Sequence, residues 1–405
     1  MPSTVPVAAH KNLDIEALRA VAIIFTFVVH FQTLPIYPAS AFSWIHRYME
    51  LSIGVDLFLV VSGFVITKSL LSSQAGGSST KAVLFAFWVR RVFRLLPAAW
   101  FWLLLVAGYK IGGSIAADGG ATVAKESLAI LAAFFNVMNF YLMVCWSAAA
   151  PDICVPQPAH GHYWSLSLEE QFYLVFPLVL LLVSRRQVIL VAAALIAILF
   201  FWQRPLFSFG FFIRVDGLCW GVLLAFMSTS KMHDSLALFF SRRIWLLRLL
   251  MLMAIAALPL VARQVLGLGN QGEPYGTGVV SLLAALIVAG ASFDLPCLSI
   301  NGLIRRTIVY LGSRSYSLYI VHMLAFFVLR ELLVWQDWDT AQANPTLMAA
   351  VICALAMTLT FLLSELTYRY IEVSWRARGR RVSERMLARS DVSVAKAAAA
   401  LAGKA

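Results

Sequence analysis

The chain has 405 residues, of which 61% are hydrophobic and only 13% are charged, whereas soluble domains carry about 25% charged residues. This composition excludes an ordinary soluble domain and predicts a protein that crosses the lipid bilayer several times. The net charge of +12 does not indicate nucleic-acid binding, because the basic residues stand between hydrophobic blocks, where they orient transmembrane helices.

Ten hydrophobic blocks have the length of a membrane-spanning helix. In chain order they cover residues 14–33, 53–72, 92–110, 164–183, 187–203, 207–228, 244–263, 278–296, 316–335 and 347–371. The expected fold is an all-α polytopic membrane helix bundle. Its transmembrane domain covers 13–371, between an N-terminal cytoplasmic tail, 1–12, and a basic, Ala-rich cytoplasmic tail, 372–405, which we expect to be disordered or loosely helical. Cytoplasmic termini place most Lys and Arg residues inside, as the positive-inside tendency favours.

The segment 126–146 is apolar but contains Asn136 and Asn139. If it crossed the membrane, the count would become eleven and most of the later arginine pairs would lie outside, so we predict a re-entrant or interfacial segment. Cys145 and Cys154 then fall in an outer loop, where a disulfide and two free thiols are both open.

The first hydrophobic block contains ionisable residues. Asp14 lies at the start of this block, Arg19 lies about one helical turn further in, and His30 follows Arg19 by eleven positions. At about 100° and 1.5 Å per residue, Arg19 and His30 share one helix face and lie about 16 Å apart along the axis. Because charges in hydrocarbon are costly unless they face the protein interior or a wet cavity, this face indicates a polar path into the membrane.

The second block places Asp56 near its outer end and Ser62 at its middle. We expect Asp56 to approach His30, because both stand near the outer ends of neighbouring antiparallel helices. A carboxylate beside an imidazole fixes its tautomer and raises its basicity. The alternative is that Asp56 caps the start of a helix.

Three arginines, Arg90, Arg91 and Arg94, form one turn of cationic surface at the inner start of the third block. Guanidinium groups suit phosphate, although a plain positive-inside anchor explains the same pattern.

Two further motifs carry polar residues into later blocks. HYWSLSLEEQFY places Ser165, Glu169 and Tyr173 on one helical stripe, with Trp164 at interfacial depth. A Glu inside the membrane boundary favours binding or acid-base work.

SRSYSLYIVH places Tyr316, Tyr319 and His322 on one broad face, where a structural role for the histidine is the alternative. Arg214 and Asp216 are expected to pair with each other or to line the same cavity. His160 and His162 are loop residues that could border an outer acceptor site.

Several familiar sites are not indicated. GLGNQG at 267–272 matches the GxGxxG pattern of dinucleotide-binding proteins. It follows a hydrophobic helix and no strand, so it does not predict a dinucleotide-binding site. The sequence contains no GxSxG, HExxH or HxxxxD motif, and the five cysteines show no CxxC spacing. We therefore expect no metal site and no bound cofactor.

The order of these motifs, from DIEALRAVA through GVDLFLVVSGF, RRVFRLLP, HYWSLSLEEQFYLVFP and RVDGLCWGVLLA to SYSLYIVH, resembles the acyltransferase 3 family of bacterial inner-membrane O-acyltransferases. The resemblance covers about residues 13 to 371. It implies transfer of an acyl group, usually acetyl from cytoplasmic acetyl-CoA, to a hydroxyl of a surface carbohydrate. Some relatives carry a fused extracytoplasmic hydrolase-like domain, which we do not expect in this chain, so a second transfer step would need a separate partner.

The resemblance, together with the residue patterns above, assigns expected roles. The catalytic group is expected to be His30 with Asp56, Arg19 and Ser62. The donor CoA is expected at Arg90, Arg91, Arg94, Asp14, Tyr316, Tyr319 and His322, and the carbohydrate acceptor at Trp164, Ser165, Glu169 and Tyr173. His30 would act as general base on the acceptor hydroxyl, and an acyl-enzyme on His30 or Ser62 is the competing route. A small-molecule or lipid-linked acceptor and a permease without chemistry remain alternatives, and the oligomeric state is left open.

Overall fold

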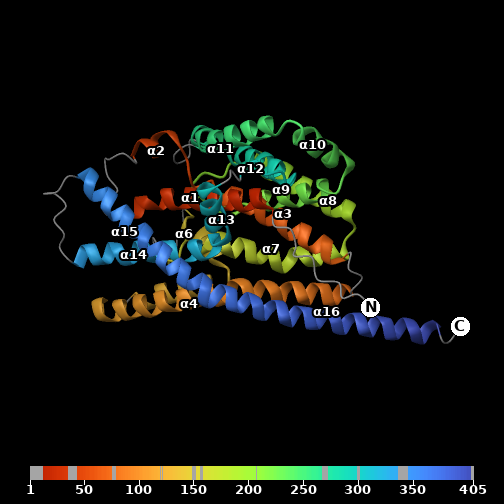
Figure 1. Ribbon diagram of the computed structural model, residues 1–405. Helices are drawn as coiled ribbons and strands as arrows, with labels where there is room; N and C mark the ends of the chain where they lie inside the picture. The colour runs from red at the N-terminus through yellow and green to blue at the C-terminus, as the bar shows by residue number, and fades with distance from the viewer. Residues whose placement is uncertain are drawn as a thin grey trace.

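A computed structural model describes residues 12–34, 43–74, 79–118, 120, 122–147, 152–155, 158–206, 208–266, 272–298, 302–335 and 345–402. Within these ranges the protein is helical and contains no strand, as the sequence predicts (Figure 1). The α-helices are α1 (Leu13–His30), α2 (Ser43–Tyr48), α3 (Gly54–Gln74), α4 (Thr80–Asp118), α5 (Val123–Phe134), α6 (Met138–Cys145), α7 (Tyr163–Leu182), α8 (Arg185–Phe200), α9 (Val215–Met227), α10 (Lys231–Ser241), α11 (Ile244–Leu266), α12 (Gly276–Ser292), α13 (Leu303–Ser313), α14 (Ser315–Trp335), α15 (Pro345–Leu366) and α16 (Val373–Ala402).

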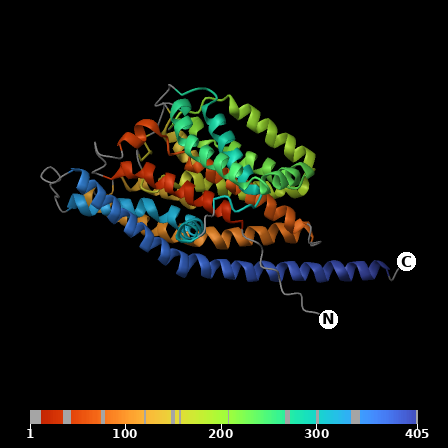
Figure 2. The ribbon, with the colours of Figure 1, turned by 45° about the horizontal axis from the view of Figure 1, so that its top comes forward.

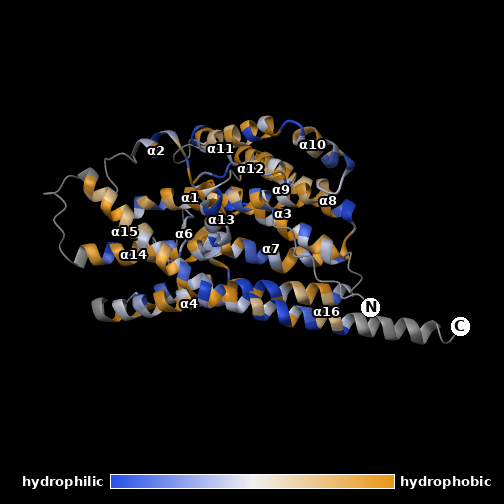
Figure 3. Ribbon diagram, viewed as in Figure 1, coloured by the Kyte–Doolittle hydropathy of each residue, from blue (hydrophilic) through white to orange (hydrophobic). Residues whose placement is uncertain are grey.

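The protein is a multi-pass membrane bundle, and a helix occupies each of the ten predicted blocks. Within the described ranges, seven helical stretches are long and apolar enough to cross a membrane. The other three blocks contain α8 and α12, with 16 and 17 residues, and α1, whose first turns carry Asp14, Glu16 and Arg19. Figure 3 shows apolar residues along most of α11 and α12 and hydrophilic residues along much of α16.

Helices α3 and α9 pack with their backbones in contact at the centre of the bundle. A Cβ atom on Gly63 would lie 2.2 Å from the carbonyl oxygen of Leu218, and one on Gly221 would lie 2.3 Å from that of Val60. Only glycine permits this approach, because any side chain would overlap the partner backbone. The contact fixes the start of α9 beside the start of α3.

The predicted re-entrant segment is broken into α5 and α6, neither of which is long enough to cross a membrane. The break falls at Asn136, whose φ of 55° lies in the left-handed region that Asn tolerates better than most residues. Cys145 and Cys154, left open by the sequence, form a disulfide after α6.

The predicted tail 372–405 is helical as far as Ala402. A π-helical turn at Thr367–Glu372 joins α15 to α16, and α16 then runs beside α4 (Figures 1 and 2). The ring centroids of Phe93 and Trp375 lie 5.7 Å apart. A Cβ atom on Gly379 would lie 2.5 Å from the Cβ of Phe93. The first half of this segment is therefore packed on the bundle.

Candidate active site

Three arginines from two helices gather inside the bundle. Arg19 comes from α1, and Arg91 and Arg94 come from α4; the three lie close enough to repel one another. The Nε atoms of all three are buried without a hydrogen-bond partner. Glu16 lies 3.6 Å from Arg19, and the Tyr173 ring centroid lies 5.5 Å from the guanidinium of Arg91. This cluster has unused donors on three mutually repelling guanidinium groups, so it suits an anion.

Glu169 lies beside this cluster. Its Oε1 accepts a hydrogen bond from Ser62 at 2.8 Å, and its Oε2 accepts one from Tyr173 at 2.8 Å. Arg19 and Arg94 are near enough to attract the carboxylate. The Glu169–Tyr173 contact is the i, i+4 pair that the sequence places on one stripe. Because Ser62 is engaged with Glu169, its hydroxyl is less available than the sequence suggests for an oxyanion.

Ser165 and Tyr319 form a further hydrogen-bonded pair, one turn from Glu169 toward the start of α7. The row of polar side chains that begins at the arginine cluster and passes Glu169 and this pair is called the polar line below. The Ser165 hydroxyl lies 2.6 Å from that of Tyr319, which donates to the backbone carbonyl of His162 at 2.7 Å. Because Tyr319 has one proton to donate, Ser165 is the donor in the first contact. Trp164, the predicted interfacial residue, packs its ring at 5.3 Å from that of Phe211.

His30 and His322 meet at the far end of the line. Nδ1 of His322 lies 2.7 Å from the carbonyl oxygen of Tyr319, and Nδ1 of His30 lies 2.7 Å from that of Thr26. A carbonyl only accepts, so both Nδ1 atoms carry protons. Nε2 of His322 therefore accepts, and it lies 3.3 Å from Nδ1 of His30. These contacts leave Nε2 of His30 unprotonated, as a general base requires.

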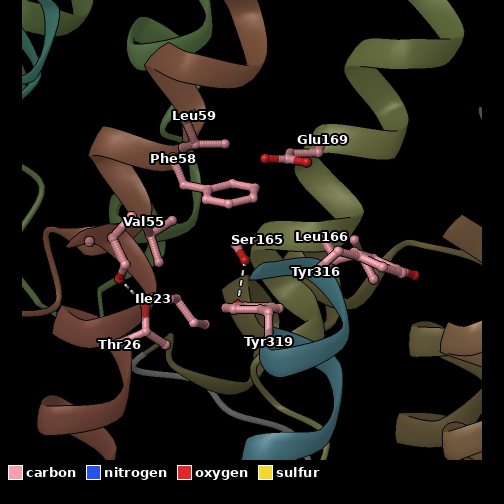
Figure 4. A pocket seen from close by; sticks show the side chains of 12 residues that line it. Ile23, Thr26, Val55, Phe58, Leu59, Ser165, Leu166, Glu169, Tyr316 and Tyr319 are labelled. Atoms are coloured by element: carbon pink, nitrogen blue, oxygen red, sulfur yellow. Dashed lines mark hydrogen bonds between the residues drawn. The ribbon is translucent and has the colours of Figure 1, made fainter. Parts of the chain in front are cut away.

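A first, narrow cavity runs between α1, α3, α7 and α14; its space totals about 450 Å³ including its open parts, but the room for water-sized molecules is only about 30 Å³. Glu169 lines one end, and Thr26 and Tyr319 line the other. Figure 4 shows Phe58 and Glu169 facing one another across this cavity. The guanidinium of Arg19 lies 5.8 Å from the centroid of the Phe58 ring, which places the arginine cluster next to the cavity wall.

A second cavity of about 1730 Å³, including its open mouth, contains His30 and Trp164 in its wall. Thr26, Val55 and Tyr319 line both cavities. The two spaces therefore adjoin, and the imidazole of His30 faces a cavity and its partner histidine. In this arrangement a ligand could reach from the arginine cluster to His30.

The expected contact between Asp56 and His30 is wrong. The Asp56 carboxylate bonds to Arg214, because the close packing of α3 on α9 brings these two residues together. The expected pair of Arg214 with Asp216 is also wrong, since both Asp216 oxygens accept from Arg204, at 2.9 and 2.8 Å. These two buried ion pairs lie at the start of α9. His322 takes the place beside His30 that we predicted for Asp56.

Two residues predicted to hold the donor make structural contacts. The Asp14 carboxylate accepts from the backbone N–H groups of Cys297 and Leu298, at 3.0 and 2.9 Å, and so anchors the segment after α12. Tyr316 lines the first cavity but donates its hydroxyl to the carbonyl of Leu95. Both side chains therefore have protein partners where we expected a ligand.

Glu170 is a further charged residue of the site, to which the sequence pattern assigned no role. This residue lies beside Arg91 and Arg94, and its Oε1 is buried without a partner. Consecutive residues of a helix point about 100° apart. Glu169 faces the cavity, and Glu170 therefore faces α4. The two adjacent acidic residues in the LEEQ stretch are the sequence feature that could have indicated a role for Glu170.

From the sequence, His162 is expected only as a loop residue that could border an outer acceptor site. It lines the second cavity, and its ring centroid lies 5.2 Å from that of His322. Both of its ring nitrogens lack a partner. Burial lowers the pKa of His162 to about 3, so the ring is neutral. In the part of the chain that the structure describes, His30, His162 and His322 do not form a metal-binding group.

The chain is 26% identical over 386 residues to O-acetyltransferase OatA of Staphylococcus aureus strain NCTC 8325 / PS 47, and equally to OatA of strain COL. Each alignment covers 90% of this chain and 57% of the relative, so the chain spans little more than half the length of these relatives. No solved structure matches the chain. The acyltransferase 3 family model, described as an acyltransferase domain, matches residues 12–365, and the chain therefore belongs to this family.

Proposed function

We propose that the protein transfers an acyl group, most simply acetyl, from acyl-CoA to a hydroxyl of a carbohydrate. The observation that carries the proposal is the polar line along adjoining cavities, from Arg19 past Glu169 and Tyr319 to His30. Membership of an acyltransferase family and the name O-acetyltransferase carried by the relatives support the same reaction.

In this proposal the arginine cluster holds the phosphates of CoA. Arg19, Arg91 and Arg94 repel one another, so an anion with several charges relieves the repulsion and uses the unpartnered nitrogens. The pantetheine arm then lies along the first cavity, which has to widen to take it and whose wall is mostly apolar near Phe58 and Leu59. The thioester reaches the region between Ser165 and the paired histidines.

His30 carries the acid-base step. Its Nε2 takes the proton from the acceptor hydroxyl as the hydroxyl oxygen attacks the thioester carbonyl. A carbon–oxygen bond forms, the carbon–sulfur bond breaks, and the CoA thiolate recovers the proton. Ser165 and Tyr319, linked at 2.6 Å, lie beside this path, and either hydroxyl has to turn from its present acceptor to donate to the oxyanion. His322 shares the positive charge that develops on His30.

The disulfide supports the orientation of this path. Cys145 and Cys154 are joined, and disulfides persist in oxidising compartments. Trp146, next to Cys145, lines the second cavity together with His30. We therefore propose that this cavity opens outside the cytoplasmic membrane of a bacterium, with the arginine cluster toward the cytoplasm and the acceptor entering beside Trp164.

The test uses the purified full chain in lipid nanodiscs with labelled acetyl-CoA and a carbohydrate acceptor. His30→Ala should lower acetyl transfer at least about 100-fold while CoA affinity is retained. His233→Ala is the matched control, because His233 contacts Ser292 and Phe293 on another part of the bundle. Wild-type transfer by His30→Ala would reject the assignment of the base. A wild-type protein that binds CoA without cleaving the thioester in the presence of acceptor would favour a permease.

A further inference from the structure

The wall of the second cavity is cationic. Lys110 of α4 and Arg330 of α14 line it, and among the described residues that line it none is Asp or Glu. The charged groups of both residues lie against the ring of Phe327, with Nζ of Lys110 at 4.5 Å and the guanidinium of Arg330 at 5.2 Å from the ring centroid. Both cations thus lie against one aromatic ring of the wall.

The two cations are held there by packing between α4 and α14. The ring centroid of Tyr109, one residue before Lys110, lies 5.6 Å from that of Phe327. Arg330 also lies 3.2 Å from Glu331, but this contact joins two exposed neighbours and such pairs contribute little. Most of the donors of both side chains therefore remain available to a ligand.

Other lining residues suit a sugar. Trp146 and Trp164 offer aromatic planes, and Gln32, Thr33 and Ser52 offer hydrogen bonds. Aromatic faces and neutral polar groups recognise sugar rings of any charge. The two cations add a preference for negative charge, because an anion in this cavity meets attraction from both and no carboxylate among the lining residues that the structure describes.

We infer that the acceptor is an anionic carbohydrate, bearing a carboxylate or phosphate that Lys110 and Arg330 bind while a nearby hydroxyl faces His30. This inference rests on the proposed function, because it names the acceptor class for the same cavity. Arg330 is suited to a bidentate contact with an acidic group, and Lys110 supplies a second point charge.

The test measures binding, which does not require acyl transfer. An oligogalacturonate and its methyl ester are titrated calorimetrically into the full chain in nanodiscs of neutral lipid. The two probes share a sugar backbone and differ in charge. We expect the carboxylate form to bind at least about tenfold tighter, with an advantage that shrinks as salt is raised. Equal affinities, or no binding by the carboxylate form, would overturn the inference.

Variants identify the cations responsible. Lys110→Met and Arg330→Met should each weaken binding of the carboxylate form about three- to tenfold and leave the ester unchanged, and Arg330→Lys should restore part of the loss. Lys125→Met is the matched control, because Lys125 pairs with Asp152 and does not line the cavity. An equal loss in Lys125→Met would contradict the assignment.

An acetyl-transfer assay on the same sugars separates the two proposals. Charge-selective binding without any acetyl transfer would reject the proposed function and leave the anionic site standing. Transfer to both sugars with equal kcat/KM would support the function and reject the preference for an anion.

Discussion

Nε2 of His322 lies 3.3 Å from Nδ1 of His30, although 292 residues separate the two in the chain. The carbonyl partners of both rings leave Nε2 of His322 as the acceptor in this contact. His322 therefore accepts from the His30 tautomer that the carbonyl of Thr26 sets, and it can share the charge that His30 gains when it takes a proton. It acts as a positioning residue for the proposed base.

Replacing His322 tests this coupling. His322→Phe keeps an aromatic ring beside Phe27 and Phe326 but removes the acceptor, so we expect acetyl transfer to fall about 100-fold and the pH profile of kcat/KM to shift. Transfer rates measured across pH check this expectation. Phe27→Leu is the control, because it changes the packing around His322 and keeps the hydrogen bond. A rate within twofold of wild type would show that the contact has no catalytic role.

The sequence predicted some of this arrangement because helical periodicity is a local property. Arg19 and His30 lie on one face of one helix, and Glu169 and Tyr173 are an i, i+4 pair, so their spacing alone placed them. The partner of Asp56 could not be found in this way. It depends on the contact between α3 and α9, which is set by glycines in both helices, and no periodicity reports which helices touch.

The same limit explains α16. Its arginines resemble a solvated tail, and the sequence alone does not reveal that Gly379 opens a place for Phe93 of α4. Likewise, nothing local to His162 indicates a neighbour in α14. Tertiary contacts of this kind decided which histidine joined His30.

The three arginines of RRVFR are predicted to differ in their contribution to donor binding. Arg91 and Arg94 carry buried Nε atoms without a partner, whereas Arg90 interacts with Glu384 of α16. We expect Arg91→Met and Arg94→Met each to lower CoA affinity at least about tenfold, and Arg90→Met to change it less than threefold. Calorimetric titration with CoA measures all three variants. If Arg90→Met gave the largest loss, the phosphates would lie on the α16 side of α4.

Asp56 is predicted to stabilise the fold through its buried pair with Arg214. Asp56→Asn leaves a buried guanidinium without its counter-charge, which costs about 3–5 kcal/mol, so thermal unfolding in detergent should begin at a clearly lower temperature. Replacing both partners, Asp56→Leu with Arg214→Met, should recover much of this loss. Asp234→Asn is the control, since exposed substitutions stay within about 0.5 kcal/mol and Asp234 is exposed. Wild-type stability with lost activity in Asp56→Asn would return Asp56 to a catalytic role.

The disulfide between Cys145 and Cys154 allows the orientation of the second cavity to be measured. In intact cells a membrane-impermeant maleimide should label these cysteines only after an impermeant reductant is added, because the reductant must reach the bond from outside. Cys219 and Cys297 are buried, and Cys353→Ala removes the remaining partly accessible thiol. In this background Ser235→Cys on α10 should be labelled only after the cells are permeabilised, since we expect α10 inside. Loss of the crosslink, which closes a short loop, should also lower stability by about 2–3 kcal/mol. Labelling of Cys145 and Cys154 only after permeabilisation would place the second cavity on the cytoplasmic side. It would also reverse the proposed path of the acyl group.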